Sequence, residues 1–294
     1  MKTTNFLYET FCILICSFCS QLIYGIDNGT RDTTKVLYDS LNRNKKSVCK
    51  LNPIVDVPIV AIGGGWSGYL LVDKLYKKSP STQEQILSLT SANINAFDRR
   101  WVYPYNATLD KNSYYPFYGC LALPVILPLT GNDMRNDYFK LCFLYLETLS
   151  VTGIFGTTST YLVDRYRPYV YDANTPIDTK LSPNAKNSFY AGHVEIVAVS
   201  TFFISEVYAG YYPESKMKWV FFTMAGLATA GMGCVRIAAG MHFPSDVLLG
   251  AATGTLSGIF VPYFHKHKVI KDPAFSFNLY EANNTYGASL VYKF

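Results

Sequence analysis

Three chemically reactive side chains stand close together in an otherwise small or apolar stretch, "CVRIAAGMHFPSDVLLGAATG", residues 234–254. His242 and Asp246 are four residues apart, and Pro244 between them suits the first turn of a helix. We expect Asp246 to turn back onto the imidazole and hold one ring nitrogen as N–H. The other nitrogen would keep its lone pair for nucleophilic attack or proton transfer. Arg236, at the end of the preceding apolar run, would face an anion with its donor fork.

Two further clusters carry similar chemistry. In "SFYAGH", residues 188–193, a turn around Gly192 precedes an apolar run, so backbone N–H groups and a helix dipole could meet an anion. His193 at that helix start could serve as a general acid. In "DRYRP", Arg165 and Arg167 follow the end of another apolar run. For Arg165, a functional role and snorkelling, in which the charged end of the side chain reaches water beside an apolar helix, are equally good explanations.

The elements that must position these clusters are six apolar runs of helical length. They are Val57–Val72, Tyr114–Thr130, Leu141–Val163, Val194–Tyr212, Trp219–Val235 and Val247–Phe264. Their lengths suit helices and are borderline for crossing a bilayer. We therefore predict an all-α fold, a bundle of about six apolar core helices over residues 55–265. In an alternating bundle the three clusters meet at one end, which gives the arginines, nucleophile and acid that phosphoryl transfer requires.

The clusters resemble the three motifs of the type-2 phosphatidic acid phosphatase superfamily, which includes vanadium haloperoxidases and bacterial acid phosphatases. The family pattern is K-x6-R-P, then P-S-G-H, then S-R-x5-H-x3-D. This chain has Thr160-x6-Arg167-Pro168, Tyr190-Ala191-Gly192-His193 and Val235-Arg236-x5-His242-x3-Asp246. The resemblance covers roughly residues 95–262, and its third motif is the most specific.

The resemblance implies a role for each matched residue. His242 would be the nucleophile that forms a phosphohistidine, Asp246 would orient it, and His193 would protonate the leaving oxygen and later activate water. The phosphate would be held by Arg167, Arg236 and the Gly192 backbone, to which we add Arg165. The family's phosphatase members need no metal, and we expect no cofactor here.

The chain departs from the family pattern at three positions of the phosphate cradle. The family lysine is Thr160, the serine of the second motif is Ala191, and the serine before Arg236 is Val235. Each lost donor can be worth on the order of 10²–10³ in rate. Lys180 or Lys186 could substitute for the lysine. An active but altered phosphatase is favoured over a weak or inactive relative.

Composition and the chain ends set the remaining expectations. Only 16% of residues are charged and the basic residues behind the net charge of +5 are scattered, which argues against nucleic acid as a partner. Residues 1–25 are predicted to be a signal peptide or membrane anchor, 26–54 a polar segment, and 266–294 a basic linker with a short β-hairpin. His265, in the basic stretch "FHKHKVIK", is expected to be solvated.

The predicted function is hydrolysis of a phosphomonoester, with a lipid phosphate favoured and a small phosphoester as the alternative. The predicted location is a bacterial cell envelope, in the inner membrane or the periplasm with the site facing the periplasm; the outer membrane is disfavoured. The alternatives are a vanadium haloperoxidase and a non-catalytic envelope protein of the same fold that binds anionic lipid. Glu147, Glu195 and Glu206 stand in apolar runs without an assigned role.

Overall fold

The structure is a computed structural model that describes residues 48–75, 78–267, 275–282 and 285–292. The predicted signal peptide or anchor, most of the polar segment 26–54 and part of the basic linker lie outside these residues. Within the described chain the α-helices are α3 (Pro53–Tyr69), α4 (Gln83–Leu87), α5 (Ala107–Asn112), α6 (Tyr114–Ile126), α7 (Asn132–Asn136), α8 (Tyr138–Leu162), α9 (Pro168–Tyr171), α10 (Ile177–Lys180), α11 (Gly192–Tyr211), α12 (Met217–Ala238) and α13 (Pro244–His267).

Short turns of other helical types extend or connect these helices. A π-helix, η1 (Leu70–Leu75), continues α3, and three 3₁₀ turns are η2 (Ser91–Asn93), η3 (Leu127–Thr130) and η4 (Pro183–Lys186). Two strands, β1 (Phe275–Ala282) and β2 (Thr285–Tyr292), pair antiparallel with Phe275 opposite Tyr292.

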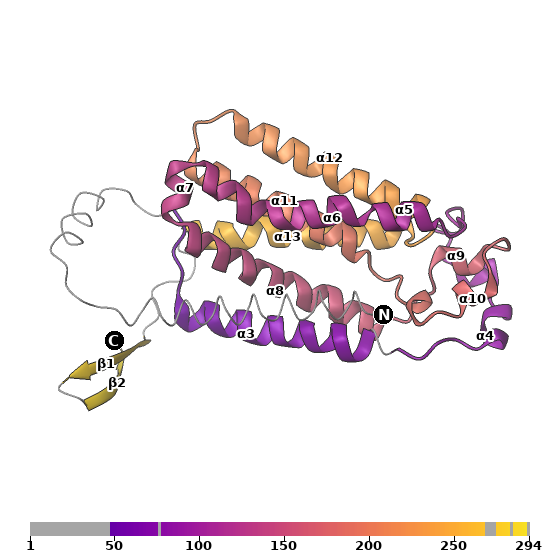
Figure 1. The fold of residues 1–294 in the computed structure, drawn as a ribbon, viewed down its shortest axis with the longest axis horizontal. Coiled ribbons are helices and arrows are strands. Elements are labelled where there is room, and N and C mark those ends of the chain that lie inside the picture. Colours follow the sequence, from indigo (N-terminus) through magenta and orange to yellow (C-terminus); the bar gives the residue numbers. More distant parts are fainter. Residues whose placement is uncertain (1–47, 76–77, 268–274, 283–284, 293–294) are drawn as a thin grey trace. The chain divides into compact units, whose positions relative to one another are not determined.

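The long helices form the bundle that the apolar runs predict, so the all-α fold class is confirmed (Figure 1). Five of them are long and apolar enough to cross a membrane: Pro53–Leu75, Tyr138–Leu162, Gly192–Tyr211, Met217–Ala238 and Pro244–Lys266. The run Tyr114–Thr130 does not form a sixth helix of that length, because α6 ends at Ile126 and a 3₁₀ turn follows. Length, composition and exposed apolar side chains such as Ile62, Leu227 and Leu248 together indicate an integral membrane protein.

Small residues let the helix backbones pack closely. Gly250, Gly254 and Gly258 repeat every four residues on one face of α13, so they form a glycine stripe against α11. A Cβ at Gly250 would lie 2.7 Å from the carbonyl oxygen of Ala191, and one at Gly258 would lie 2.7 Å from that of Val199. The stripe therefore brings the start of α11 against the start of α13, which is where two of the predicted reactive clusters stand.

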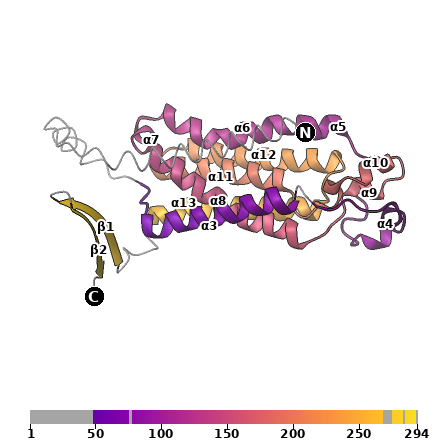
Figure 2. The same cartoon turned by 60° about the horizontal axis from the view of Figure 1, so that its bottom comes forward.

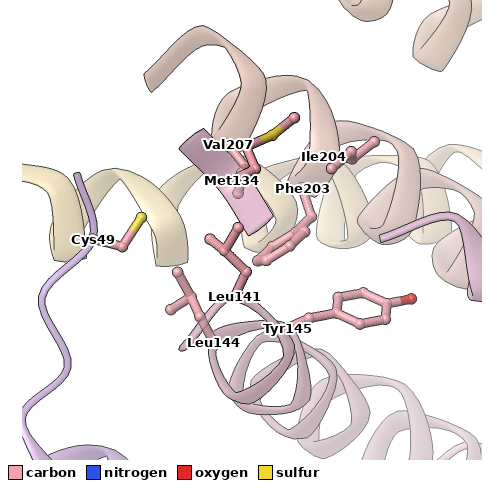
Figure 3. Close-up of a cluster of buried hydrophobic side chains, with 8 residues drawn as sticks. All are labelled: Cys49, Met134, Leu141, Leu144, Tyr145, Phe203, Ile204 and Val207. Carbon is pink, nitrogen blue, oxygen red and sulfur yellow. The ribbon is translucent and has the colours of Figure 1, made fainter. Parts of the chain in front are cut away.

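An apolar core fills the end of the bundle away from those clusters. Leu141 and Leu144 of α8 pack there with Phe203 of α11 (Figure 3). The hydroxyl of Tyr145 lies 2.7 Å from that of Ser200, so the one polar atom of this ring is satisfied inside the core. At the opposite end, α4, α9 and α10 gather beyond the end of α8 (Figures 1 and 2).

Candidate active site

The turn between α12 and α13 places His242. Gly240 follows the C-cap residue Ala239 with φ +71°, and the N–H of Met241 donates to Arg236 O while that of Gly240 donates to Ile237 O. This pair of bonds is the Schellman motif, which ends a helix at a left-handed residue. The chain reverses over residues 239–243, so Arg236 on the last turn of α12 and His242 before α13 lie at the same end of the bundle.

The His242 ring has a defined tautomer. Its Nδ1 lies 2.7 Å from the carbonyl oxygen of Ser188, which can only accept, so Nδ1 carries the proton. The other nitrogen, Nε2, therefore holds the lone pair and lies 3.3 Å from Nη1 of Arg167. His242 is 3% exposed, so this lone pair is shielded from bulk water. The arrangement leaves a fixed, neutral nucleophile beside a guanidinium.

Arg167 is a buried cation held by neutral groups. Its Nε donates to the carbonyl of Asn184 at 2.9 Å, its Nη2 to the Asn184 side chain at 3.0 Å, and its Nη1 to the carbonyl of Met241 at 3.0 Å. It is 6% exposed and takes part in none of the ion pairs found among the described residues. Burying a charge without a counter-charge is costly, so this site favours an anion next to His242 Nε2.

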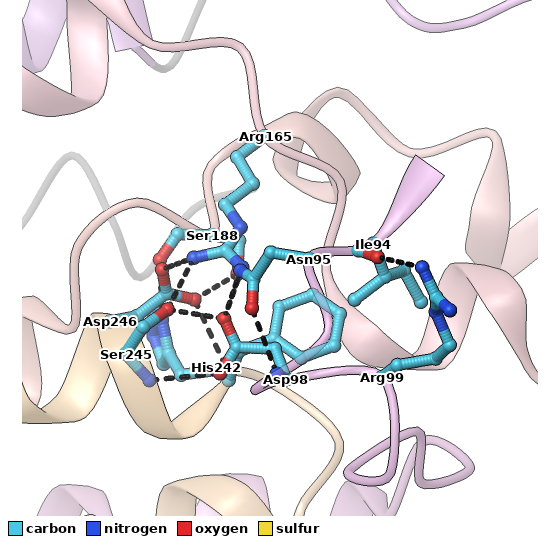
Figure 4. A network of polar contacts seen from close by, with 10 residues as sticks. Ile94, Asn95, Asp98, Arg99, Arg165, Ser188, His242, Ser245 and Asp246 are labelled. Carbon is cyan, nitrogen blue, oxygen red and sulfur yellow. Dashed lines mark hydrogen bonds and ion pairs between the residues drawn. The ribbon is translucent and has the colours of Figure 1, made fainter. Parts of the chain in front are cut away.

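Asp246 does not contact the His242 ring, which corrects the expected role of this carboxylate. Its Oδ2 accepts from the Ser188 hydroxyl at 2.6 Å and from the Phe243 N–H at 3.0 Å, and its Oδ1 accepts from Arg165 (Figure 4). The spacing of four residues does bring the two backbones together, but the carboxylate is directed towards Ser188. Asp246 therefore acts on His242 through Ser188, whose carbonyl holds the ring.

Arg165 is committed to two buried carboxylates and is not free to bind phosphate as predicted. Its Nη2 pairs with Asp98 Oδ2 at 2.7 Å. Its Nη1 pairs with Asp246 and also donates to the Ser245 hydroxyl at 2.8 Å. Its guanidinium stacks over the Phe243 ring at 4.6 Å. The Asp98 carboxylate also accepts the backbone N–H of Ser245 at 3.1 Å. This network ties the chain before α5 to the start of α13 (Figure 4).

Arg236 is buried and paired. Its Nη1 lies 2.6 Å from Asp110 Oδ1 and donates to the Ser113 hydroxyl at 2.8 Å. Its Nε is buried and has no hydrogen-bond partner among the described residues. One donor is therefore left over for a ligand, although Asp110 already balances the charge.

His193 stands on the first turn of α11, where Gly192 begins the helix. Its ring packs between Tyr114 and Phe117, with centroid distances of 4.6 and 4.7 Å. The Nε2 atom is buried and has no hydrogen-bond partner among the residues that the structure describes. An unsatisfied ring nitrogen is suited to exchange a proton with a bound ligand.

Electrostatics keep His242 neutral. Burial lowers its pKa well below the usual value, and the charges of Arg167 and Arg236 lower it further, while the Ser188 carbonyl acts in the opposite direction. Burial, then the charge of Arg236, lowers the pKa of Arg167 to about 10, so this guanidinium remains charged at neutral pH. The pair thus offers an uncharged nucleophile and a fixed cation.

In the described part of the chain, the structure gives no replacement donor at the three positions, Thr160, Ala191 and Val235, where the chain departs from the family pattern. The Thr160 hydroxyl donates to the Gly156 carbonyl of its own helix at 2.9 Å, and the Ala191 side chain is buried against Val194. Val235 offers no polar atom at all. No hydrogen bond or ion pair within the described residues joins Lys180 or Lys186 to Arg167 or His242, so their substitution for the family lysine stays a prediction.

Several residues of the site carry no signal in the sequence. Asn184 holds Arg167, the Ser188 carbonyl holds His242, and Asp98 and Asp110 neutralise Arg165 and Arg236. Asp98 lies in a connection and Asp110 in the short helix α5, neither of them in a recognisable motif, and backbone carbonyls leave no trace in residue type. Among the described residues, the group with metal-ligating geometry is Asp56, Glu147 and His265, at the other end of the bundle. His265 is 8% exposed, so the expectation that it is solvated is wrong.

Comparison with known proteins gives a family match over the segment from α8 to α13. Residues 141–270 match the model of the PAP2 superfamily. The matched segment begins later than the expected range 95–262 and ends eight residues beyond it. A similar solved structure is the "first transmembrane PAP2 type phosphatidylglycerolphosphate phosphatase from Bacillus subtilis", with 18% identity and a TM-score of 0.45 over 74% of this chain and 98% of that one. No curated protein matches the chain.

Proposed function

Over residues 141–270 the chain belongs to the PAP2 superfamily, and on this premise we propose that it hydrolyses phosphomonoesters through a covalent intermediate on His242. The family match supports a phosphatase of this superfamily. The chemistry of the individual residues is our proposal.

One observation carries the proposal: Arg167 is a buried guanidinium without a carboxylate partner among the described residues, and it lies against the lone pair of His242 Nε2. A phosphoryl group at this point would supply the missing negative charge and take over the Nη1 donor. Its phosphorus atom would then stand next to the nucleophile. Positioning and charge stabilisation of this kind make up most of the catalysis of phosphoryl transfer.

The proposed reaction has two steps. His242 Nε2 attacks phosphorus, the N–P bond forms, the P–O bond to the leaving group breaks, and His193 gives its proton to the leaving oxygen. In the second step His193 removes a proton from water, the water oxygen attacks phosphorus, and the N–P bond breaks to release inorganic phosphate. Arg167 and the free Nε of Arg236 would stabilise the equatorial oxygens in both steps.

The surroundings of the site favour a lipid phosphate. Five helices are long and apolar enough to cross a membrane, and the site lies where four of them (α8, α11, α12 and α13) begin or end. A surface hollow beside it is lined by three aromatic side chains (Phe97, Trp101 and Tyr103), by Arg100 and by Ala96. Aromatic rings with a nearby arginine suit the interface of a bilayer, where an apolar tail and an anionic headgroup meet. We further propose that this end faces the periplasm, as the proposed inner end carries Arg135, Lys140 and Lys218. The difference in basic residues between the two ends is slight, because Arg100, Lys180 and Lys186 lie at the site end.

The test is phosphate release by the full-length protein in detergent. Phosphatidic acid, an isoprenyl phosphate and a soluble aryl phosphate serve as substrates, and His242→Ala is the inactive comparison. Arg167→Ala is expected to lower kcat/KM by about 10²–10³, whereas Arg135→Ala, a control for loss of an arginine on the exposed helix α7, is expected to keep the wild-type rate. Folded wild-type protein that turns over none of these substrates above His242→Ala would refute the proposal.

A second candidate function is binding of an anionic lipid headgroup without turnover. Thr160 and Ala191 favour it, because they remove donors from the cradle while leaving Arg167 in place. The same preparation separates the two functions: on this alternative the wild-type protein would bind phosphatidic acid in mixed detergent micelles and release no phosphate from it.

A further inference from the structure

A second group of buried polar side chains lies far from His242. Asp56 on the first turn of α3, Glu147 on α8 and His265 near the end of α13 have ligand atoms within 4.8 Å of one another. Asp246 and His265 are 19 residues apart on the same helix, so the two sites are separated by about 28 Å at 1.5 Å per residue. The exposed fractions of the three residues are 0%, 2% and 8%.

The three side chains turn one polar atom each toward a common point, and for Asp56 and His265 the other polar atom is already hydrogen-bonded. The Oδ2 of Asp56 accepts the backbone N–H of Asn52 at 2.5 Å, which leaves Oδ1. The Nδ1 of His265 lies 2.8 Å from the Val261 carbonyl and must donate to it, which leaves Nε2 with a lone pair when the ring is neutral. Asp56 Oδ1, Glu147 Oε2 and His265 Nε2 are all buried and have no hydrogen-bond partner among the described residues.

The distances suit a shared ion better than direct hydrogen bonds. His265 Nε2 lies 3.4 Å from Asp56 Oδ1 and 3.3 Å from Glu147 Oε2. A charge-assisted N–H···O bond would be about 2.7–2.9 Å long. Two ligands bound at about 2.0–2.1 Å with a tetrahedral angle lie about 3.3–3.4 Å apart.

We propose that Asp56, Glu147 and His265 bind one divalent first-row transition-metal ion. Two buried carboxylates need a compensating positive charge, which a divalent ion supplies in full. The imidazole ligand favours zinc and its neighbours over magnesium and calcium, which prefer oxygen ligands alone. The ion would join α3 to α8 and α13, so its role is structural, and the site is independent of the proposed phosphatase reaction.

The test uses full-length protein in detergent that has been treated with EDTA and desalted. Co²⁺ serves as the spectroscopic probe and Zn²⁺ as the probe for stoichiometry and thermal unfolding. Wild-type protein is expected to bind about one ion per chain, to develop the visible absorption of nitrogen- and oxygen-ligated Co²⁺, and to unfold at a higher temperature with Zn²⁺. Because outer-shell changes already cost 10–100-fold in affinity, Glu147→Gln and His265→Gln are each expected to lose on the order of 100-fold or more.

Two matched controls separate this site from other buried groups. Glu195→Gln removes a buried carboxylate of α11, and His193→Gln removes the partly buried imidazole of the same helix; both variants are expected to bind Zn²⁺ as the wild type does. If Glu147→Gln fails to fold, Asp56→Asn and the wild-type Co²⁺ spectrum decide the matter. Wild-type protein without stoichiometric Zn²⁺, or equal binding by the ligand variants, would overturn the proposal and assign the cluster to an imidazolium between two carboxylates.

Discussion

Substituting Gly240 tests how the α12–α13 turn places the nucleophile. Gly240 has φ +71°, and a Cβ there would lie 2.6 Å from Pro104 O and 2.7 Å from Tyr103 O. Ordinary contact begins at 3.4 Å, so the backbone would have to move by about 0.8 Å. Gly240→Ala therefore strains the Schellman motif and pushes the turn away from the chain before α5.

The magnitude follows from two contributions. The left-handed conformation costs an alanine roughly 1–2 kcal/mol, and overpacking against immobile backbone adds about 1–3 kcal/mol. Gly240→Ala is thus expected to destabilise the protein by about 2–5 kcal/mol. Because His242 follows two residues later, a shift of this size is also expected to lower kcat by about 10²-fold.

The assay compares thermal unfolding and aryl phosphate turnover for wild type, Gly240→Ala and Gly231→Ala. Gly231 is a helical residue of α12 whose added Cβ would meet nothing within 4 Å. Alanine there is expected to be neutral or to stabilise the helix by about 0.5–1 kcal/mol. If Gly240→Ala unfolded at the wild-type temperature and kept the wild-type rate, the account of this turn would be refuted.

The remaining predictions concern the site itself. The pKa of His242 is lowered well below its usual value, so the ring stays neutral as the pH falls through about 6.5. The plot of kcat/KM against pH is therefore expected to show no decrease in that range from protonation of the nucleophile. A decrease with an apparent pKa near 6.5 that reports His242 would contradict this. In the unfolded chain the same ring binds a proton below about 6.5, so thermal stability is expected to fall with pH in that range, and less so in a folded His242→Asn variant. Ser188→Ala keeps the backbone carbonyl that holds His242 and removes only the hydroxyl bond to Asp246. The variant is expected to lose about 1–3 kcal/mol of stability and to keep a kcat within about tenfold of the wild-type value. Complete loss of turnover in folded protein would show that the hydroxyl takes part directly. Ala191 is the N-cap of α11 without a side-chain bond, so Ala191→Ser is expected to stabilise the protein by about 0.5–2 kcal/mol in thermal unfolding, and an unfolding temperature below that of the wild type would contradict this.

The sequence predicts the bundle well because its apolar runs are long and interrupted by polar connections. It also predicts that Arg236, His242 and Asp246 share one end, since their spacing is fixed by a helix end and a helix start. It does not predict the direction of the Asp246 carboxylate. That direction depends on Ser188 and Arg165, which arrive from other parts of the chain.

Long-range contacts explain the other differences. The basic neighbours of His265 suggest a solvated helix end, yet Asp56 and Glu147 cover its ring from α3 and α8. Arg165 and Arg167 are two residues apart and of the same type, yet among the described residues only Arg165 pairs with carboxylates. No local pattern separates these two arginines, because their partners come from loops whose path is set by the whole fold.

Trapping the covalent intermediate tests the central claim most directly. Wild-type protein mixed with a ³²P-labelled phosphomonoester and quenched in base, where a phosphohistidine survives, is expected to carry label on His242. His242→Ala is expected to carry none, and His193→Gln is expected to retain the label for longer because its release needs an activated water. Label on another residue, or turnover by wild type without any label, would contradict nucleophilic attack by His242.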